Sequence, residues 1–380
     1  MMKKALLITL ALVFGLQTLF SQQLAKARKD GKFGYINKKA EFVIQPQFKK
    51  ANSFADGVAL VLEGKKWGYI NPDGKWLLEA QFDKAKDFNN GVAMVLKNKK
   101  WQYIDKEGKE LTYSNAEKIY PFKEGVAFVR EGKMVGLMNP KGEVIVKPQY
   151  KTIKGFQNGY ARFASQSGQW GIIDNKGAIV IKPEYTSIGN YVNGVARAEK
   201  GEEVFGIASS NSFNKVDGAT KIWDFRTGGT YTIARKDEKI GFVDKEGKWV
   251  IEPQFVKAKP FKNGYAGVFD GNKWGFIDTN GKVVIDYKYA DVDYFDNNGM
   301  APVKIEDWGF VNLKGELVIE AKYGITAGSF GFLSGRAAEK GFVDGLARVK
   351  YEKKWGFLTP DGKLLGDTWF DNAEPFVNVK

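Results

Sequence analysis

The feature that most constrains this chain is an aromatic residue followed by glycine, which returns every 34 or 35 residues, with one last interval of 47. Glycine follows the aromatic position in every copy except one, where the next residue is Gln102. The ten residues at this position are Phe33, Trp67, Trp101, Val135, Trp170, Phe205, Ile240, Trp274, Trp308 and Trp355. A period of this size indicates an array of small units that are stable only through contact with their neighbours.

One copy of the unit, residues 57–88, predicts three antiparallel strands. Two short apolar runs, 58–62 and 67–71, have β-prone composition and are separated by a lysine-rich turn. A second turn, Asn71-Pro72-Asp73-Gly74, has asparagine to bond the backbone, proline to fix φ and glycine to accept an open geometry. A third strand follows at 75–79. Since this turn also recurs with aspartate at its start, we predict an all-β chain of antiparallel three-stranded meanders.

The same residues resemble a known repeat family. The strongest matches are the segments 66–71, 170–174, 273–278 and 354–358, together with the third-strand forms 43–48 and 250–255. They resemble the WG-repeat family, also called KWG repeats, over roughly residues 24 to 376. The resemblance implies an exported bacterial repeat scaffold and brings no catalytic residue with it. Gln102, the Val135 and Ile240 positions and the whole sixth copy depart from the family pattern.

Two architectures are compatible with ten such units. An open, elongated or superhelical stack is favoured, because ten blades exceed the usual 4–8 of a propeller and three strands are fewer than the usual four. The alternative is a closed β-propeller-like ring. It is suggested by Leu24 to Ala27, which match the first strand of a unit, while the last unit runs to about Phe376, where another first strand would begin. In such a ring the N-terminal strand would complete the last unit.

The domain organisation follows from the two ends of the chain. Residues 1–21 are predicted to be a signal peptide, with Lys3 and Lys4 before an apolar run of twelve residues, too short for the ~20 that span a bilayer. An uncleaved anchor or a buried helix is the alternative. Residues 22–380 form a single repeat array, with a degenerate unit at about 205–229 and an insertion at about 324–340. The absence of cysteine removes disulfides as a source of stability.

The residue types limit the possible chemistry. Without His and Cys, the chain has no imidazole base, no thiolate nucleophile and no usual zinc ligand set. The recurring turn aspartates exchange with asparagine, which a turn tolerates and a general acid does not. The tryptophans exchange with Val135 and Ile240, which favours packing over sugar stacking. The acidic run 291–296 is interpreted as a solvated strand end rather than a Ca²⁺ site. We therefore predict no catalytic residue, no metal and no cofactor.

Two groups of residues are candidates for ligand binding. In the first strand of each unit, a variable position lies between two small or apolar positions, and Arg162, Arg197 and Arg348 occupy it in three copies. A tolerant surface position is the alternative interpretation. The insertion supplies the second group, because long loops on rigid repeat scaffolds are often functional. Its candidate residues are Phe330, Phe332 and Arg336.

The predicted function is a non-enzymatic exported repeat scaffold that binds a protein or glycan partner at the cell envelope. The formal net charge of +14 supports a first alternative, a polyanion binder for anionic polysaccharide. Because the lysines cluster at turns and the charge is spread along the chain, we expect no dedicated groove for a polyanion. A second alternative is a carbohydrate-active enzyme with an Asp/Glu pair about 5–9 Å apart. We expect a periplasmic, outer-surface or secreted monomer, without nucleic acid and without a stable transmembrane segment after signal cleavage.

Overall fold

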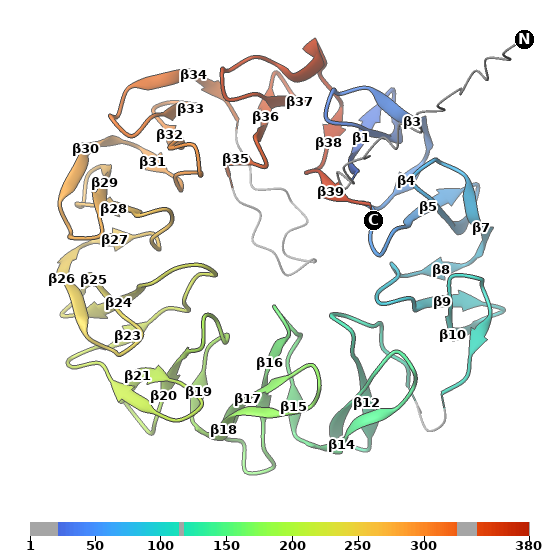
Figure 1. The fold of residues 1–380 in the computed structure, drawn as a ribbon, viewed down its shortest axis with the longest axis horizontal. Helices are drawn as coiled ribbons and strands as arrows, with labels where there is room; N and C mark the ends of the chain where they lie inside the picture. The colour runs from blue at the N-terminus through green and yellow to red at the C-terminus, as the bar shows by residue number, and fades with distance from the viewer. Residues whose placement is uncertain (1–21, 114–117, 325–339, 380) are drawn as a thin grey trace, which may run out of the picture.

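The computed structural model describes residues 22–113, 118–324 and 340–379. Within these ranges the strands form ten small antiparallel sheets, arranged as blades around a common centre (Figure 1). The described residues contain no α-helix; a single 3-10 turn, η1 (Leu365–Asp367), lies in the last blade. The protein is a ten-bladed β-propeller. The signal peptide predicted at residues 1–21 lies outside the described residues.

Blade 2 shows the regular pattern. Its strands are β4 (Lys50–Ala51), β5 (Ala59–Glu63), β6 (Lys66–Ile70) and β7 (Trp76–Phe82), paired in this order. The three long strands are the predicted meander, and β7 lies at the outside of the ring (Figure 1). The two-residue strand β4 was not predicted, because the sequence analysis treated that stretch as a connection. It gives the blade the four strands that are usual in propellers.

The other blades are built from the same strand types, but blades 4 and 10 each contain three described strands instead of four. The first strands are β1 (Gln23–Lys29), β9 (Ala93–Lys97), β12 (Ala127–Glu131), β16 (Tyr160–Ala164), β20 (Ala196–Glu199), β24 (Thr232–Lys236), β28 (Tyr265–Phe269), β32 (Ala301–Lys304) and β36 (Leu346–Tyr351). The second strands are β2 (Lys32–Ile36), β10 (Lys100–Ile104), β13 (Met134–Met138), β17 (Trp170–Asp174), β21 (Phe205–Ala208), β25 (Lys239–Val243), β29 (Trp274–Asp278), β33 (Trp308–Val311) and β37 (Lys354–Leu358).

The outer and short strands vary more in length. The outer strands are β3 (Phe42–Phe48), β11 (Glu110–Leu111), β14 (Val144–Tyr150), β18 (Ile179–Tyr185), β22 (Phe213–Lys215), β26 (Trp249–Phe255), β30 (Val283–Tyr289) and β34 (Leu317–Tyr323). The short strands are β8 (Lys84–Ala85), β15 (Thr152–Ile153), β19 (Ser187–Ile188), β23 (Lys221–Ile222), β27 (Lys257–Ala258), β31 (Asp291–Val292), β35 (Phe342–Val343), β38 (Asn372–Ala373) and β39 (Val377–Asn378).

The two ends of the chain close the ring. Strand β1 pairs antiparallel with β38 (Ala27 opposite Ala373) and with β39 (Leu24 opposite Val377). The N-terminal strand therefore shares one blade with the C-terminal segment (Figure 1). The open stack that the sequence analysis favoured is wrong, and the closed ring, its alternative, is confirmed. An open stack would expose the edge of β1 and the side chain of Leu24, which is 0% exposed here.

The hydrophobic core lies between neighbouring blades. Tyr69 and Phe82 of blade 2 pack in one cluster with Phe88 and Val95, which belong to the next unit. Ala59 and Val61, which flank the variable position of the first strand, are 0% exposed. This confirms the prediction that the small positions form a buried face and that each unit depends on its neighbours.

The glycine after the aromatic residue is required by a β-bulge in the outer strand. The register between β6 and β7 shifts between Trp67 and Tyr69, so Gly68 faces the bulged backbone. A Cβ at Gly68 would lie 2.7 Å from the carbonyl oxygen of Leu78, closer than a side-chain atom can approach. Blade 3, where Gln102 replaces this glycine, has an outer strand of only two residues, which pair with Tyr103 and Ile104.

Candidate functional site

The variable position of the first strand is a contact between blades. Lys26 of blade 1 donates a hydrogen bond from Nζ to the carbonyl oxygen of Ala51, in the short strand of blade 2 (3.0 Å). Leu60 is 3% exposed and Thr232 is 0% exposed at the equivalent position. The position is therefore half-buried or buried between blades, and it does not form a row of open surface residues. A ligand-binding role for its three arginines stays a prediction.

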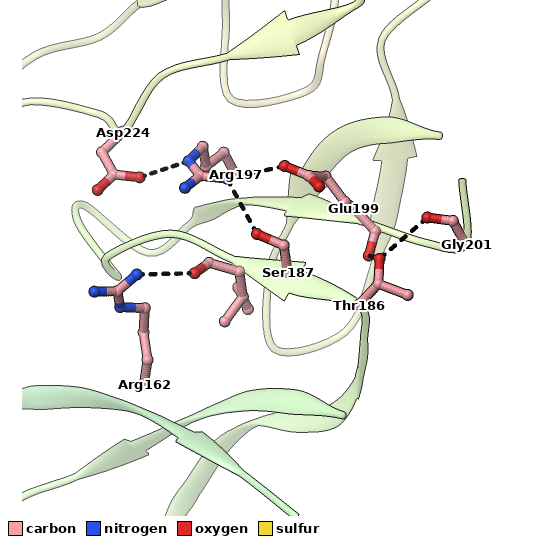
Figure 2. Close-up of polar contacts among 8 residues, drawn as sticks. Arg162, Thr186, Ser187, Arg197, Glu199, Gly201 and Asp224 are labelled. Atoms are coloured by element: carbon pink, nitrogen blue, oxygen red, sulfur yellow. Dashed lines mark hydrogen bonds and ion pairs between the residues drawn. The ribbon is translucent and has the colours of Figure 1, made fainter. Parts of the chain in front are cut away.

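Arg197 is held in a polar cluster that joins blades 6 and 7 (Figure 2). Its Nε lies 3.0 Å from Oδ1 of Asp224, and its Nη1 lies 3.2 Å from Oε1 of Glu199 and 3.5 Å from Oγ of Ser187. Gly189 leaves room for this arrangement, because a Cβ there would lie 2.0 Å from Oδ1 of Asp224. The two carboxylates neutralise the guanidinium group, which indicates a structural role. We call such a contact between the variable position and the next blade a joint.

Arg162 approaches the same short strand, β19, from blade 5 (Figure 2). Its Nη1 donates a long hydrogen bond of 3.5 Å to the carbonyl oxygen of Ile188. Among the described residues, no carboxylate forms an ion pair with it. Arg162 and Arg197 thus contact consecutive residues of β19, Ile188 and Ser187, but only Arg197 is neutralised.

Arg348 lies at the seam where the ring closes. Its Nε donates to the carbonyl oxygen of Ala373 in blade 1, and its guanidinium carbon is 3.6 Å from the ring centre of Trp355. Arg348 is 9% exposed and Glu374 is 4% exposed. Burial lowers the pKa of Arg348, and the charge of Glu374 acts against this shift. Within the described part of the chain, Nη1 of Arg348 and Oε1 of Glu374 have no hydrogen-bond partner.

The three candidates in the insertion, Phe330, Phe332 and Arg336, lie outside the described residues. The structure places only the flanks of the insertion. Gly324 forms a backbone bridge with Lys350 of β36, and Nζ of Lys340 lies 4.3 Å from the ring centre of Trp308. Gly324 and Lys340 therefore contact blades 10 and 9, respectively.

The tryptophans of the repeated position pack into the clusters between blades. Trp67 packs against the cluster that contains Tyr69 and Phe88, and Trp170 packs against another. Lysine side chains cover several of these rings; Nζ of Lys154, for example, lies 5.5 Å from the ring centre of Trp170. The packing interpretation of these tryptophans is confirmed.

The aspartates and asparagines that begin the repeated turns bond to the backbone. Oδ1 of Asn71 accepts the N–H of Asp73 (3.1 Å) and of Lys75 (2.9 Å). Oδ1 of Asp174 accepts the N–H of Lys176 (2.9 Å) and of Ala178 (2.8 Å). Because a carboxylate oxygen and an amide oxygen accept the same backbone hydrogen bonds in this turn, Asp and Asn can replace each other between copies.

The acidic run 291–296 is also used within the fold. Oδ1 of Asp291 lies 2.9 Å from Nζ of Lys259, and Oδ1 of Asp296 accepts the N–H of Met300 at 2.8 Å. Burial raises the pKa of Asp293. No group of three acidic side chains in the described ranges is arranged to hold a metal ion.

A small pocket of about 270 Å³ lies between blades 8 and 9. It contains one carboxylate, that of Asp296. Its lining is Asn263, Tyr265, Phe295, Asp296, Asn297, Gly299 and Leu313.

Sequence reasoning missed the partners of the variable position. The donors Lys26, Arg162 and Arg348 reach a short-strand carbonyl 25 or 26 residues later, and Arg197 reaches Asp224 27 residues later. This recurring offset could have revealed the contact between neighbouring blades.

A search of the described residues finds no helix with the length and apolar character needed to cross a lipid bilayer.

Comparison with solved structures returns chains of low similarity. The computationally designed protein Ika8 shares 11% identity, with 75% of this chain and 95% of that chain covered and a TM-score of 0.34. BamB from Moraxella catarrhalis shares 9% identity over 71% and 95% of the two chains, with a TM-score of 0.29. The dihydro-heme d1 dehydrogenase NirN, in complex with DHE, shares 12% identity over 70% and 74%, with a TM-score of 0.29. No curated protein matches the sequence.

A family model described as "WG containing repeat" matches the chain eight times. The matched segments are 33–67, 67–101, 103–134, 136–164, 170–203, 240–274, 274–307 and 308–330. The longest unmatched interval between two matches, 204–239, contains the short outer strand β22 of blade 6. These segments cover well over half of the sequence, and the chain belongs to the family of WG-repeat proteins.

Proposed function

We propose that this protein is a non-enzymatic scaffold, exported from the cell, that binds a protein or glycan partner at the cell envelope. The observation that carries the proposal is the structural use of the recurring turn residues and of the recurring tryptophans. The turn residues, represented by Asn71 and Asp174, bond to the backbone, and the tryptophans pack between blades. What remains is a rigid ring with variable loops, which suits recognition better than chemistry.

The absence of His and Cys from the sequence supports the non-enzymatic part of the proposal. The pocket between blades 8 and 9 adds support, because its lining offers the single carboxylate of Asp296, whose Oδ1 accepts two backbone N–H groups. A glycosidase would need a second carboxylate about 5–9 Å away in the same site.

The export part rests on residues 1–21, whose charged start and short apolar run are typical of a signal peptide. The chain expressed with this segment should be recovered outside the inner membrane, and mass spectrometry should find Gln22 as its first residue. Recovery of the uncut chain from the cytoplasm would contradict export.

The binding part is tested by capture. The purified exported protein is immobilised and exposed to envelope extracts at low and high salt, with a heat-unfolded sample as control. The proposal expects at least one protein or glycan to be retained by the folded ring at both salt concentrations. Capture of nothing contradicts it, and hydrolysis of polysaccharide by the purified protein contradicts its non-enzymatic part.

A further inference from the structure

All hairpin turns between first and second strands lie on one face of the ring, because every blade has the same strand directions. We call this the tip face. In blade 1 the hairpin ends with Lys29 opposite Lys32, and Phe33 pairs with Phe48, so the outer strand ends at this face as well. The Asn-x-x-Gly turns, represented by Asn71, lie at the other end of the strands, on the opposite face.

The tip face is electrically polarised. The hairpin turns of blades 1–4 contain eight lysines and three carboxylates; these turns are Lys29–Lys32, Glu63–Lys66, Lys97–Lys100 and Glu131–Met134. The turns of blades 6–9 contain five lysines and eight carboxylates; these are Glu199–Phe205, Lys236–Lys239, Phe269–Trp274 and Lys304–Trp308. We call the first set the basic arc and the second the acidic arc. They lie on opposite sides of the ring (Figure 1).

The whole chain has the same asymmetry. Residues 22–183 contain 29 Lys and Arg against 16 Asp and Glu, whereas residues 184–380 contain 27 against 28. The expectation that the positive charge is spread along the chain is therefore wrong. Nearly all of the excess belongs to blades 1–5, which occupy one half of the ring.

Of the eight lysines in the basic arc, Lys66 pairs with Asp83 and Lys100 pairs with Glu110, while the other six form no ion pair with a described residue. Among the described residues, 22–183 form three ion pairs, whereas 184–379 form nine. Lys65, Lys99 and Lys133 are exposed, lie 34 residues apart on successive blades, and make no ion pair within the described ranges. They present one positive charge per blade along the arc.

We propose that the basic arc binds an acidic polysaccharide, a proposal that rests on the proposed function and specifies its ligand. Regularly spaced, flexible ammonium groups suit a linear polymer with repeated carboxylates, because binding releases its condensed counterions. A bilayer is a poorer fit, because membrane-binding surfaces add apolar side chains. The exposed apolar residues of blades 1–5 lie at the start of the outer strands, near the opposite face: Val43, Leu77, Val144 and Ile179.

A second copy of the chain also fits less well. Its acidic arc carries a net charge of −3 against the +5 of the basic arc, so pairing of two copies would leave positive charge on both. An external polyanion can neutralise the whole arc.

The test uses immobilised polygalacturonate, with neutral dextran as reference, and the purified exported protein. The variant K65E/K99E/K133E reverses three charges on the tip face. Its matched control, K75E/K141E/K176E, reverses three exposed lysines in the turns of blades 2, 4 and 5 on the opposite face. At low salt the wild type should bind polygalacturonate and not dextran. The tip variant should bind at least about tenfold more weakly and with a smaller salt dependence, while the control stays within about twofold of the wild type.

Equal weakening of both triple variants would overturn the proposal, because only net charge would then matter. Stronger binding to anionic phospholipid vesicles than to polygalacturonate would overturn the choice of polysaccharide. If sedimentation showed that the wild type is a dimer and the tip variant a monomer, the basic arc would be assigned to binding a second copy of the chain. The proposed function is separable: if the tip variant binds polygalacturonate as tightly as the wild type, and the wild type still captures an envelope component at high salt, that function stands while this inference fails.

Discussion

Blades 2 and 6 occupy equivalent places in the ring but contact their neighbours through different chemistry. In blade 2 the variable position is Leu60, 3% exposed and packed in an apolar cluster. In blade 6 it is Arg197, held between Asp224 and Glu199 (Figure 2). Both residues sit in a first strand with the same pairing. The fold therefore fixes where blades touch, and each joint uses whichever chemistry its residues supply.

The outer strands of the two blades differ as well. In blade 2, β7 has seven residues and a bulge opposite Gly68. In blade 6, β22 has three residues, and its turn uses Oγ of Ser209 to accept the N–H of Asn211 and of Ser212. The outer strand can shorten because the cores between blades are built mainly from the inner strands.

The largest effect is expected from breaking the bulge contact of blade 2. Gly68→Gln would place a side chain against the backbone of Leu78 and Ala80 and should lower the free energy of unfolding by at least about 4 kcal/mol. The matched control is Gln102→Gly in blade 3, where the outer strand is short; it should cost no more than about 1 kcal/mol. Urea unfolding followed by tryptophan fluorescence measures both. Similar losses in the two variants would contradict the bulge explanation.

Truncation of the apolar joint should have the next largest effect. Leu60→Ala removes buried methyl groups between blades 2 and 3 and should cost about 3 kcal/mol, without a dependence on salt. The urea midpoint at two salt concentrations is the measurement. A loss below about 1 kcal/mol would mean that the blades are held together elsewhere.

The polar joint of blade 6 should contribute less. Its groups are one quarter to one third exposed, so the coupling between Arg197 and Asp224 should be about 1 kcal/mol and should weaken with salt. A double-mutant cycle with Arg197→Ala and Asp224→Ala measures this coupling. Glu199→Gln serves as a control that keeps the pair intact. A coupling between Arg197 and Asp224 that does not change with salt and exceeds the loss caused by Leu60→Ala would show that the polar contact is the stronger of the two.

The sequence predicted the repeated parts of this fold and missed the parts that depend on closure. The period, the turn chemistry of Asn71 and the packing of Trp67 are local properties that recur in most copies of the unit. Leu24 to Ala27 suggested the ring, but the pairing of Leu24 with Val377 joins the two ends of the chain, and no pattern within a single unit decides between a ring and a stack. The joint of Arg197 was missed for a similar reason, since its partner Asp224 belongs to the next blade.

The turns offer the smallest effects and the finest comparison of the two blades. Asn71 satisfies two backbone N–H groups, so Asn71→Ala should cost about 1 kcal/mol, while Asn71→Asp, the residue found in other copies, should cost less than half of that. Ser209→Ala in blade 6 removes longer bonds, of 3.3 and 3.1 Å, and should cost about 0.5 kcal/mol. Urea midpoints of the three variants give the order. If Ser209→Ala cost more than Asn71→Ala, the turn of blade 6 would carry more of the stability than its short outer strand suggests. Blade 6 would then not tolerate the loss of contacts at its outer edge.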